Sequence, residues 1–226
     1  MPRSLTLMLL MLALAVAGCG GGDSDDEPAP AAPAAPKPQA QSGGCQQVAA
    51  PEPKPDGGQQ KPKRPLDPEK TYDVVLQTSC GSFTIRLDQR TSPATAASFA
   101  ALARKRFFDG TVFHRIVPGF VIQGGDPTGT GMGGPGYSTR DKPPATATYT
   151  KGVVAMAKTP DEPAGTSGSQ FYVVTGVDAG LPAEYALLGR VHKGLETVRR
   201  IGELGDAATE QPLQPVVVES ATVRER

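Results

Sequence analysis

Hydrophobic and polar residues alternate in the first strand-like part of the chain. In "SFTIRLD", Phe83, Ile85 and Leu87 alternate with polar positions, and "YDVVLQT" precedes this segment. Such alternation is typical of a strand with one buried face. The two segments are separated by Ser79-Cys80-Gly81, which is a turn signal. The pattern therefore predicts a β-hairpin near residue 80.

Two segments have helical periodicity instead. Ser92 is a candidate N-cap with Pro93 at the first helical position, and Phe99 and Leu102 follow at helical spacing. A second helix is predicted over 195–203, where apolar residues recur on one side.

Further short segments rich in β-branched residues predict six more strands, at Thr111–Val117, Gly119–Gln123, Gly152–Met156, Gln170–Thr175, Ala186–His192 and Pro215–Val223. Many antiparallel strands with two helices favour a mainly β fold, a closed barrel capped by the helices. This domain is expected over residues 71–226.

The N-terminus has a different pattern. Residues 1–18 hold one early arginine and an apolar stretch that is too short to span a membrane, as in a secretory signal peptide. The sequence "VAGC" that ends at Cys19 resembles a bacterial lipobox, which implies cleavage before Cys19 and acylation of that cysteine. The alternative is an ordinary signal peptide with an incidental cysteine. We expect an extracytoplasmic protein that is anchored to a membrane by its lipid.

Residues 19–70 are rich in proline and glycine and contain few large apolar side chains. Such a composition cannot bury enough surface to offset ordering entropy, and it predicts a linker. Of the three cysteines in the chain, acylation of Cys19 would leave Cys45 and Cys80. Disulfides persist in exported proteins, so we favour a Cys45–Cys80 disulfide over free thiols or intermolecular pairing.

Composition excludes several classes of function. Lys plus Arg and Asp plus Glu both number 23, and tryptophan is absent, so there is no electrostatic or stacking argument for nucleic acid. The glycines between Gly129 and Gly134 match a dinucleotide fingerprint, but no helix signal follows them. No Cys and His residues have metal-ligand spacing, so neither a metal nor a cofactor is expected.

One segment combines apolar strand residues with unexpected polar ones. "FHRIVPGFVIQGGD", at 113–126, is followed in order by "GTGMGGPGY", "GVVAMA", "SGSQFYVVT" and "YALLGRV". This series of motifs resembles the cyclophilins, the β-barrel peptidyl-prolyl isomerases, over about residues 72–223. The resemblance implies a closed eight-stranded antiparallel barrel with two capping helices.

The resemblance also implies a set of site residues. Those expected to be catalytic are Arg115, Phe120 and Gln123. Those expected to bind substrate are Val121, Ala157, Lys158, Gln170, Tyr172, Leu181 and Tyr185.

The chain departs from the family pattern at several of these positions. Lys158 stands where asparagine is common, and Tyr172 stands where phenylalanine is usual. Tyr185 replaces a histidine, as in bacterial members, and Gly180 aligns with a rim tryptophan that many members carry. We leave His114 as a structural residue, since the family does not use that position for chemistry.

The implied activity is rotation about X–Pro bonds of polypeptide substrates during the folding of exported proteins. Arg115 would stabilise the twisted amide of the transition state. The alternative is a proline-recognising chaperone or adaptor module with little turnover. A monomer is expected.

Overall fold

The computed structural model describes residues 44–226, and this part of the chain is mainly β. The long strands are β1 (Tyr72–Thr78), β2 (Gly81–Leu87), β10 (Leu187–Lys193) and β11 (Val217–Glu225). The shorter strands are β3 (Thr111–Val112), β4 (Arg115–Val117), β5 (Val121–Gly124), β6 (Thr139–Arg140), β7 (Val153–Met156), β8 (Thr166–Ser167) and β9 (Phe171–Val174). The two helices are α1 (Pro93–Arg104) and α2 (Leu195–Gly202). No helix in this part of the chain is long and apolar enough to cross a membrane.

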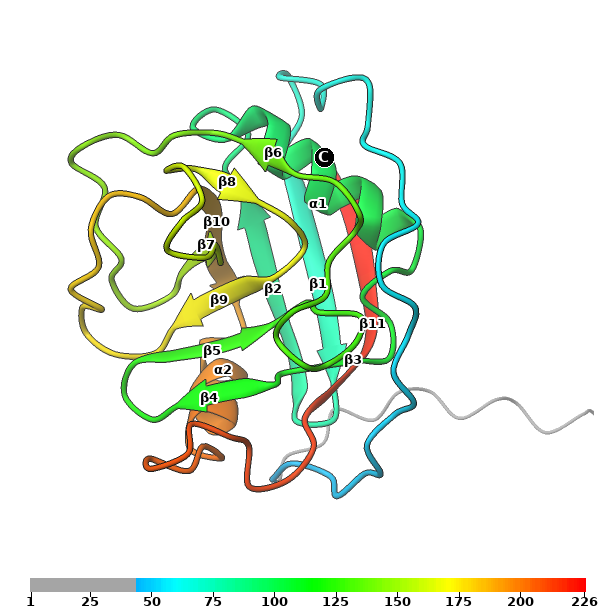
Figure 1. The fold of residues 1–226 in the computed structure, drawn as a ribbon, viewed down its shortest axis with the longest axis vertical. Coiled ribbons are helices and arrows are strands. Elements are labelled where there is room, and N and C mark those ends of the chain that lie inside the picture. Colours follow the sequence, from blue (N-terminus) through cyan, green and yellow to red (C-terminus); the bar gives the residue numbers. More distant parts are fainter. Residues whose placement is uncertain (1–43) are drawn as a thin grey trace, which may run out of the picture. The chain divides into compact units, whose positions relative to one another are not determined.

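The strands form one curled nine-stranded sheet in the order β3-β11-β1-β2-β10-β7-β9-β5-β4, and β6 and β8 pair separately (Figure 1). Every pairing is antiparallel, and β1 and β2 form the predicted hairpin. The prediction of a closed eight-stranded barrel was wrong in strand number and in closure. Among the described residues, no ladder joins the edge strands β3 and β4. A single bridge joins Val112 of β3 to Asp126, which follows β5.

The correction has a local cause. The predicted strand at 111–117 is interrupted at Phe113 and His114, so that β3 pairs with β11 while β4 pairs with β5. One strand has become two, each with a different neighbour, and a ladder cannot run continuously across the break. The pair β6 and β8 has only two residues in each strand, too few to produce an alternating pattern in the sequence.

Helix α1 begins as the sequence predicted, with Ser92 at the N-cap and Pro93 in the first turn. The Ser92 side chain makes no capping hydrogen bond and its hydroxyl is buried without a described partner. The helix is therefore held mainly by packing, since most of its side chains are buried, Phe99 and Leu102 almost completely.

Alternating residues of the central strands pack in two separate apolar clusters. Ile122 of β5 and Val173 of β9 belong to the large cluster inside the curl of the sheet. Their chain neighbours Val121, Tyr172 and Val174 point to the opposite side of these strands and belong to a smaller cluster. Because adjacent side chains of a strand point to opposite faces, both faces of β5 and β9 are covered. The smaller cluster is the apolar floor of the site described below.

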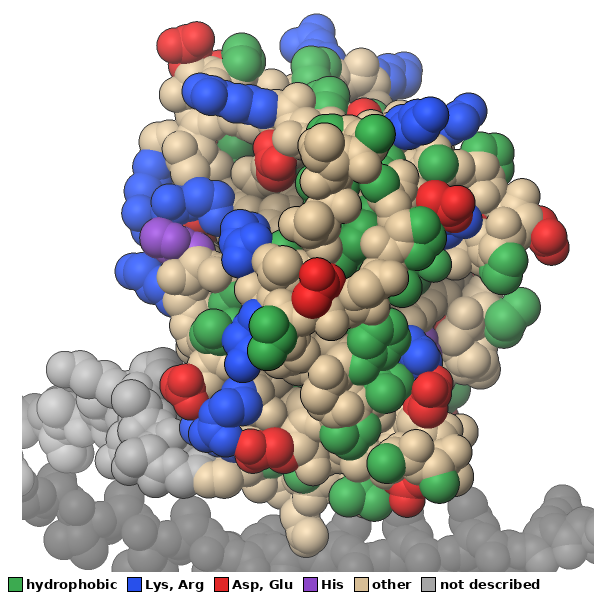
Figure 2. Space-filling view, turned by 90° about the vertical axis from the view of Figure 1, so that its left-hand side faces the viewer, with side chains coloured by type: hydrophobic (Ala, Val, Ile, Leu, Met, Phe, Trp, Pro, Cys, Tyr) green, Lys and Arg blue, Asp and Glu red, His purple; other side chains and the backbone are tan. Residues whose placement is uncertain are grey.

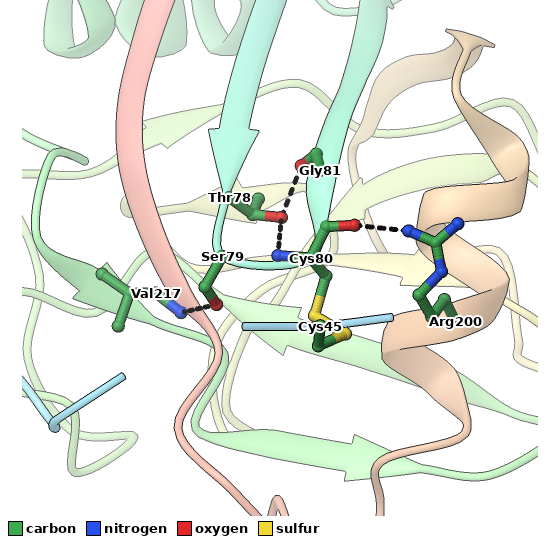
Figure 3. Close-up of a disulfide and its surroundings, with 7 residues drawn as sticks. All are labelled: Cys45, Thr78, Ser79, Cys80, Gly81, Arg200 and Val217. Carbon is green, nitrogen blue, oxygen red and sulfur yellow. Dashed lines mark hydrogen bonds between the residues drawn. A yellow bond between two sulfur atoms is a disulfide. The ribbon is translucent and has the colours of Figure 1, made fainter. Parts of the chain in front are cut away.

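Residues 44–70, called the strap below, contain neither helix nor strand, yet they lie along the domain (Figure 1). The structure contains the Cys45–Cys80 disulfide that the cysteine count favoured (Figure 3). The Cys80 carbonyl also accepts a hydrogen bond of 2.7 Å from Arg200 of α2. The strap therefore begins at a fixed point on the β1–β2 turn.

The strap is fixed again at Lys54. Its ammonium donates to the carbonyls of Phe107 and Asp109 at 2.5 and 3.0 Å and lies 5.6 Å from the Phe107 ring centroid. Partial burial lowers the pKa of Lys54, although the nearby Asp109 carboxylate opposes this change. A segment predicted as linker from its composition is thus held on the surface by contacts that its composition does not reveal.

Candidate functional site

The pairing of four strands brings the predicted site residues together. Arg115 of β4 lies opposite Gln123 of β5, and Gln123 lies opposite Tyr172 of β9. Tyr172 in turn lies opposite Ala155 of β7. Residues that face one another across a sheet point to the same side, so these side chains form one surface.

This surface is the floor of a cavity of about 240 Å³, called the proline pocket below. All the predicted catalytic and substrate-binding residues except Gln170 line this pocket. The lining residues are Arg115, Phe120, Val121, Gln123, Ala157, Lys158, Tyr172, Leu181 and Tyr185. The exception, Gln170, lines an adjoining cavity of about 350 Å³, which shares Gln123, Ala157 and Lys158 with the proline pocket.

The side of the domain on the left of Figure 1, where the turn between β4 and β5 lies, is drawn in Figure 2. Hydrophobic side chains lie there in several groups among acidic and basic ones. This mixture agrees with the zero net charge of the chain.

Arg115 is held from the outer side of the proline pocket. Its Nε donates to Oε2 of Glu210 at 2.7 Å, and its guanidinium carbon lies 6.0 Å from the centroid of the Phe120 ring. The Arg115 side chain is 34% exposed. The terminal guanidinium nitrogens have no hydrogen-bond partner among residues 44–226, so they are free to donate to a ligand in the pocket.

Gln123 belongs to a hydrogen-bonded pair. Its Nε2 donates to Oε1 of Gln170 at 3.1 Å. The Nε2 of Gln170 donates to the carbonyls of Gly131 and Gly133 at 2.8 and 2.9 Å. Each amide is thus oriented by the next group, and the last support is the glycine-rich loop over 126–137.

This loop is folded around Asp126, whose side chain is fully buried. The carboxylate accepts hydrogen bonds from the backbone of Thr128, Gly131 and Gly133. Burial by itself would raise the pKa of Asp126, but these hydrogen bonds outweigh it and hold the pKa below its usual value. A Cβ on Gly133 would come within 2.2 Å of the carboxylate, so the tight turn requires glycine.

Tyr172 and Tyr185 line the proline pocket, and the fully buried Tyr149 packs against both of them. Tyr149, Tyr172 and Tyr185 have ring centroids 5.7–6.4 Å apart. The Tyr149 hydroxyl donates to the Tyr185 carbonyl at 2.7 Å and accepts from the Tyr185 N–H at 3.0 Å. Burial raises the pKa of Tyr172, whose hydroxyl has no described partner.

Lys158 stabilises the rim of the pocket. Its side chain is 3% exposed, and its ammonium lies 3.2 Å from a Glu184 carboxylate oxygen and 5.5 Å from the Tyr185 ring centroid. A lysine where asparagine is common therefore joins the end of β7 to the rim. Leu181 and Gly180 lie on the same rim segment, and a Cβ at Gly180 would contact nothing within 4 Å.

The structure gives His114 no chemical partner. Both ring nitrogens are buried without a hydrogen bond to a described residue, and burial lowers the pKa of the imidazole. Within residues 44–226, no group of three or more His, Cys, Asp or Glu residues could hold a metal ion.

Sequence reasoning missed several residues that support the site. Glu210 and Tyr149 lie in irregular segments and have no motif of their own. The signal for Asp126 was present, since an acid directly before a glycine-rich turn often accepts backbone hydrogen bonds. Glu210 also has a positive φ of 60°, which only the structure reveals.

Comparison with known proteins agrees with this geometry. A family model described as "Cyclophilin type peptidyl-prolyl cis-trans isomerase/CLD" matches residues 73–223. The chain is 35% identical to peptidyl-prolyl cis-trans isomerase-like 1 of Gibberella zeae, over 69% of this chain and 96% of the relative. It is also 35% identical to peptidyl-prolyl cis-trans isomerase CYP18-2 of Arabidopsis thaliana, over 65% of this chain and 90% of the relative.

A solved structure has the same fold. The crystal structure of a Cryptosporidium parvum cyclophilin type isomerase in the presence of the dipeptide Ala-Pro is 29% identical, with a TM-score of 0.62. The match covers 67% of this chain and 98% of that one. The chain belongs to the cyclophilin-type peptidyl-prolyl cis-trans isomerase family.

Proposed function

We propose that this isomerase accelerates X–Pro rotation by stabilising a twisted amide in the proline pocket, with Arg115 as the donor to the prolyl nitrogen. The observation that carries the proposal is the pocket itself, which combines free guanidinium N–H groups with apolar walls on one surface. The related Cryptosporidium parvum structure was determined in the presence of the dipeptide Ala-Pro, which supports a proline-containing peptide as the substrate.

The chemistry requires no covalent step. The X–Pro amide has a rotation barrier of about 18–20 kcal/mol, because the C–N bond has double-bond character. In the twisted state the nitrogen becomes pyramidal and regains a lone pair. A donor aimed at that lone pair stabilises the twisted state and not the planar one, which lowers the barrier.

The other residues have distinct roles in this proposal. The proline ring would be held by apolar walls: Phe120, Val121, Tyr172 and Leu181. The Gln123 amide, oriented by Gln170, would hold the carbonyl that precedes the proline. Ala157 and Lys158 would limit how the preceding residue lies. Tyr185 would close the rim.

One hydrogen bond cannot account for the whole acceleration. Taking exchange from about 100 s to about 10 ms is a factor of roughly 10⁴, or about 5.5 kcal/mol. A hydrogen bond to a charged group contributes about 1.5–3 kcal/mol. The remainder comes from positioning and from exclusion of water by the apolar walls.

Exchange NMR on a short Ala-Pro peptide tests the proposal, because it measures cis–trans exchange directly at equilibrium. We expect substoichiometric protein to broaden or exchange the cis and trans signals. A titration of the same peptide measures binding separately. Binding without any gain in exchange rate would instead support the non-catalytic proline-recognising module.

We also propose that the enzyme works on exported proteins from a lipid anchor at Cys19. The support is the "VAGC" sequence and the disulfide, which suits an oxidising compartment. Cys19 lies outside the described residues, and the relatives named above are eukaryotic. Mass spectrometry of the mature N-terminus should find an acylated cysteine, and Cys19→Ala should release the protein from membranes. An unmodified, fully soluble wild-type protein would refute the anchor.

A further inference from the structure

The strap is bonded to the glycine-rich loop as well as to the β1–β2 turn. The N–H of Gly57 donates to the Gly134 carbonyl and the N–H of Gln59 donates to the Pro135 carbonyl, both at 3.0 Å. The Oδ1 of Asp56 accepts a hydrogen bond of 2.8 Å from the Gly134 N–H. Gly134 is therefore held by the strap at both its N–H and its carbonyl group.

The two segments are also in close contact. A Cβ on Gly136 would lie 3.0 Å from the Gly57 Cα and 3.1 Å from the Gly58 nitrogen. Real Cβ contacts are seldom so short, and Gly136 has a φ of 85° that disfavours other residues. Lys61 extends the contact by donating to the Ser138 carbonyl at 3.0 Å. The close fit between the loop and the strap therefore requires glycine at position 136.

The loop that the strap holds is the one that orients the glutamine pair. The carbonyls of Gly131 and Gly133 both accept from Gln170, and Gln170 accepts from Gln123 in the proline pocket. A short series of hydrogen bonds and peptide bonds therefore leads from Asp56 to Gln123. Asp56 also lines the adjoining cavity, together with Gln123 and Gln170.

The strap lies before the matched family domain, which begins at residue 73. Without it, a loop with many glycines would have few constraints on its backbone, because glycine has wide conformational freedom. Within the loop, the Asp126 carboxylate accepts hydrogen bonds from residues as far as Gly133, whereas Gly134 and Gly136 are contacted from the strap. The strap thus constrains the part of the loop that Asp126 does not reach.

We propose that Asp56 is a positioning residue of the isomerase, which holds the glycine-rich loop so that Gln170 and Gln123 keep their orientation in the active site. The inference rests on the proposed role of Gln123 in binding the substrate carbonyl. It assigns the strap to the catalytic unit, and it makes the acceptor oxygen of Asp56, not its charge, the important feature.

The test uses the full chain and three variants. Asp56→Ala removes the acceptor, and Asp56→Asn removes the charge but keeps an oxygen acceptor. Glu52→Ala is the matched control, because Glu52 is an exposed acid of the same strap with no hydrogen bond or ion pair to another described residue. Each variant is assayed by exchange NMR with the Ala-Pro peptide, and the side-chain amide signals of Gln123 and Gln170 are compared.

Because one hydrogen bond is lost, we expect kcat/KM to be about three- to tenfold lower in Asp56→Ala. Asp56→Asn and Glu52→Ala should stay within about twofold of the wild type. Among these three variants, only Asp56→Ala should shift the Gln123 and Gln170 amide signals. Should Asp56→Ala fail to fold, Lys61→Ala removes the strap's contact with Ser138, directly after the loop, and should shift the same signals.

Unchanged amide signals together with a wild-type kcat/KM in Asp56→Ala would overturn the proposal. Equal losses in Asp56→Asn and Asp56→Ala would overturn the assignment to the acceptor oxygen. The amide signals can be measured without turnover. A protein that does not accelerate exchange would therefore refute the proposed function, while the signals would still decide the role of Asp56.

Discussion

Replacement of Arg115 by alanine tests the chemical part of the mechanism. The ion pair with Glu210 uses Nε, so only the terminal nitrogens remain to donate to the prolyl nitrogen. The two side chains are 34% and 46% exposed, so solvent weakens the pair, and its loss should cost only about 0.2–1 kcal/mol of stability. The folded state should therefore survive the substitution.

The expected loss of activity is larger than the loss of stability. A hydrogen bond from a charged donor contributes about 1.5–3 kcal/mol, and partial exposure places Arg115 in the lower part of that range. A loss of about 1.5–2 kcal/mol corresponds to a roughly 10- to 30-fold lower kcat/KM. The affinity for the planar ground-state peptide should change much less, because the contact forms in the twisted state.

The measurement combines exchange NMR for turnover with a peptide titration for ground-state binding. Arg115→Lys should recover only part of the activity, because an ammonium lacks the planar fork. Arg104→Ala is the matched control, since Arg104 also has an ion pair and partial exposure but lies on α1 and does not line the pocket. A folded Arg115→Ala protein with the turnover of this control would refute the catalytic role of the arginine.

Three further predictions concern stability. Tyr172→Phe removes a buried hydroxyl with no described partner, so the unfolding free energy should rise by about 1 kcal/mol with activity retained; a chemical denaturation that shows a loss would contradict this. The pKa values of His114 and Asp126 are lower in the folded protein than in the unfolded chain, where they are near 6.5 and 3.9. Each group therefore contributes to the free energy of unfolding above its unfolded pKa, and this contribution is lost as pH falls through its folded pKa. The temperature of thermal unfolding should therefore fall between pH 7 and pH 5, and it should fall less in His114→Phe. An equal fall in the wild type and in His114→Phe would count against this role of His114. Reduction of Cys45–Cys80, which closes a separation of 35 residues, should lower stability by up to about 4 kcal/mol, whereas a denaturation midpoint unchanged by reductant would show that the bond contributes little.

Local periodicity was sufficient for the first hairpin and for the helices. The alternation around Phe83 predicted the β1–β2 hairpin, and Pro93 with the apolar spacing after it predicted α1. Both signals depend on neighbours in the chain, whose spacing decides which side chains share a face. The motif series predicted most of the side chains that line the proline pocket, because the side chains of each motif lie together on one strand or turn.

The same reasoning could not predict pairings between distant segments. The break at Phe113 and His114 arises because β3 and β4 each pair with a different partner, and no local signal records that choice. The closed eight-stranded ladder expected from the family resemblance is consequently absent from the described residues. A strand pattern states which face is buried, but the neighbouring strand is decided by the packing of the whole sheet.

Some residues of the site could be found from the sequence and others could not. Arg115 and Gln123 lie in one motif. The partners Glu210 and Arg115 are separated by 95 positions in the sequence, and Asp56 and Gly134 are separated by 78. The sequence alone determined both helices, the longer strands, the family resemblance and most of the side chains that line the proline pocket, because these depend on short spacings. Only the tertiary structure decided how the strap is held and what orients those side chains, because hydrogen bonds between irregular segments require backbone positions that periodicity does not encode.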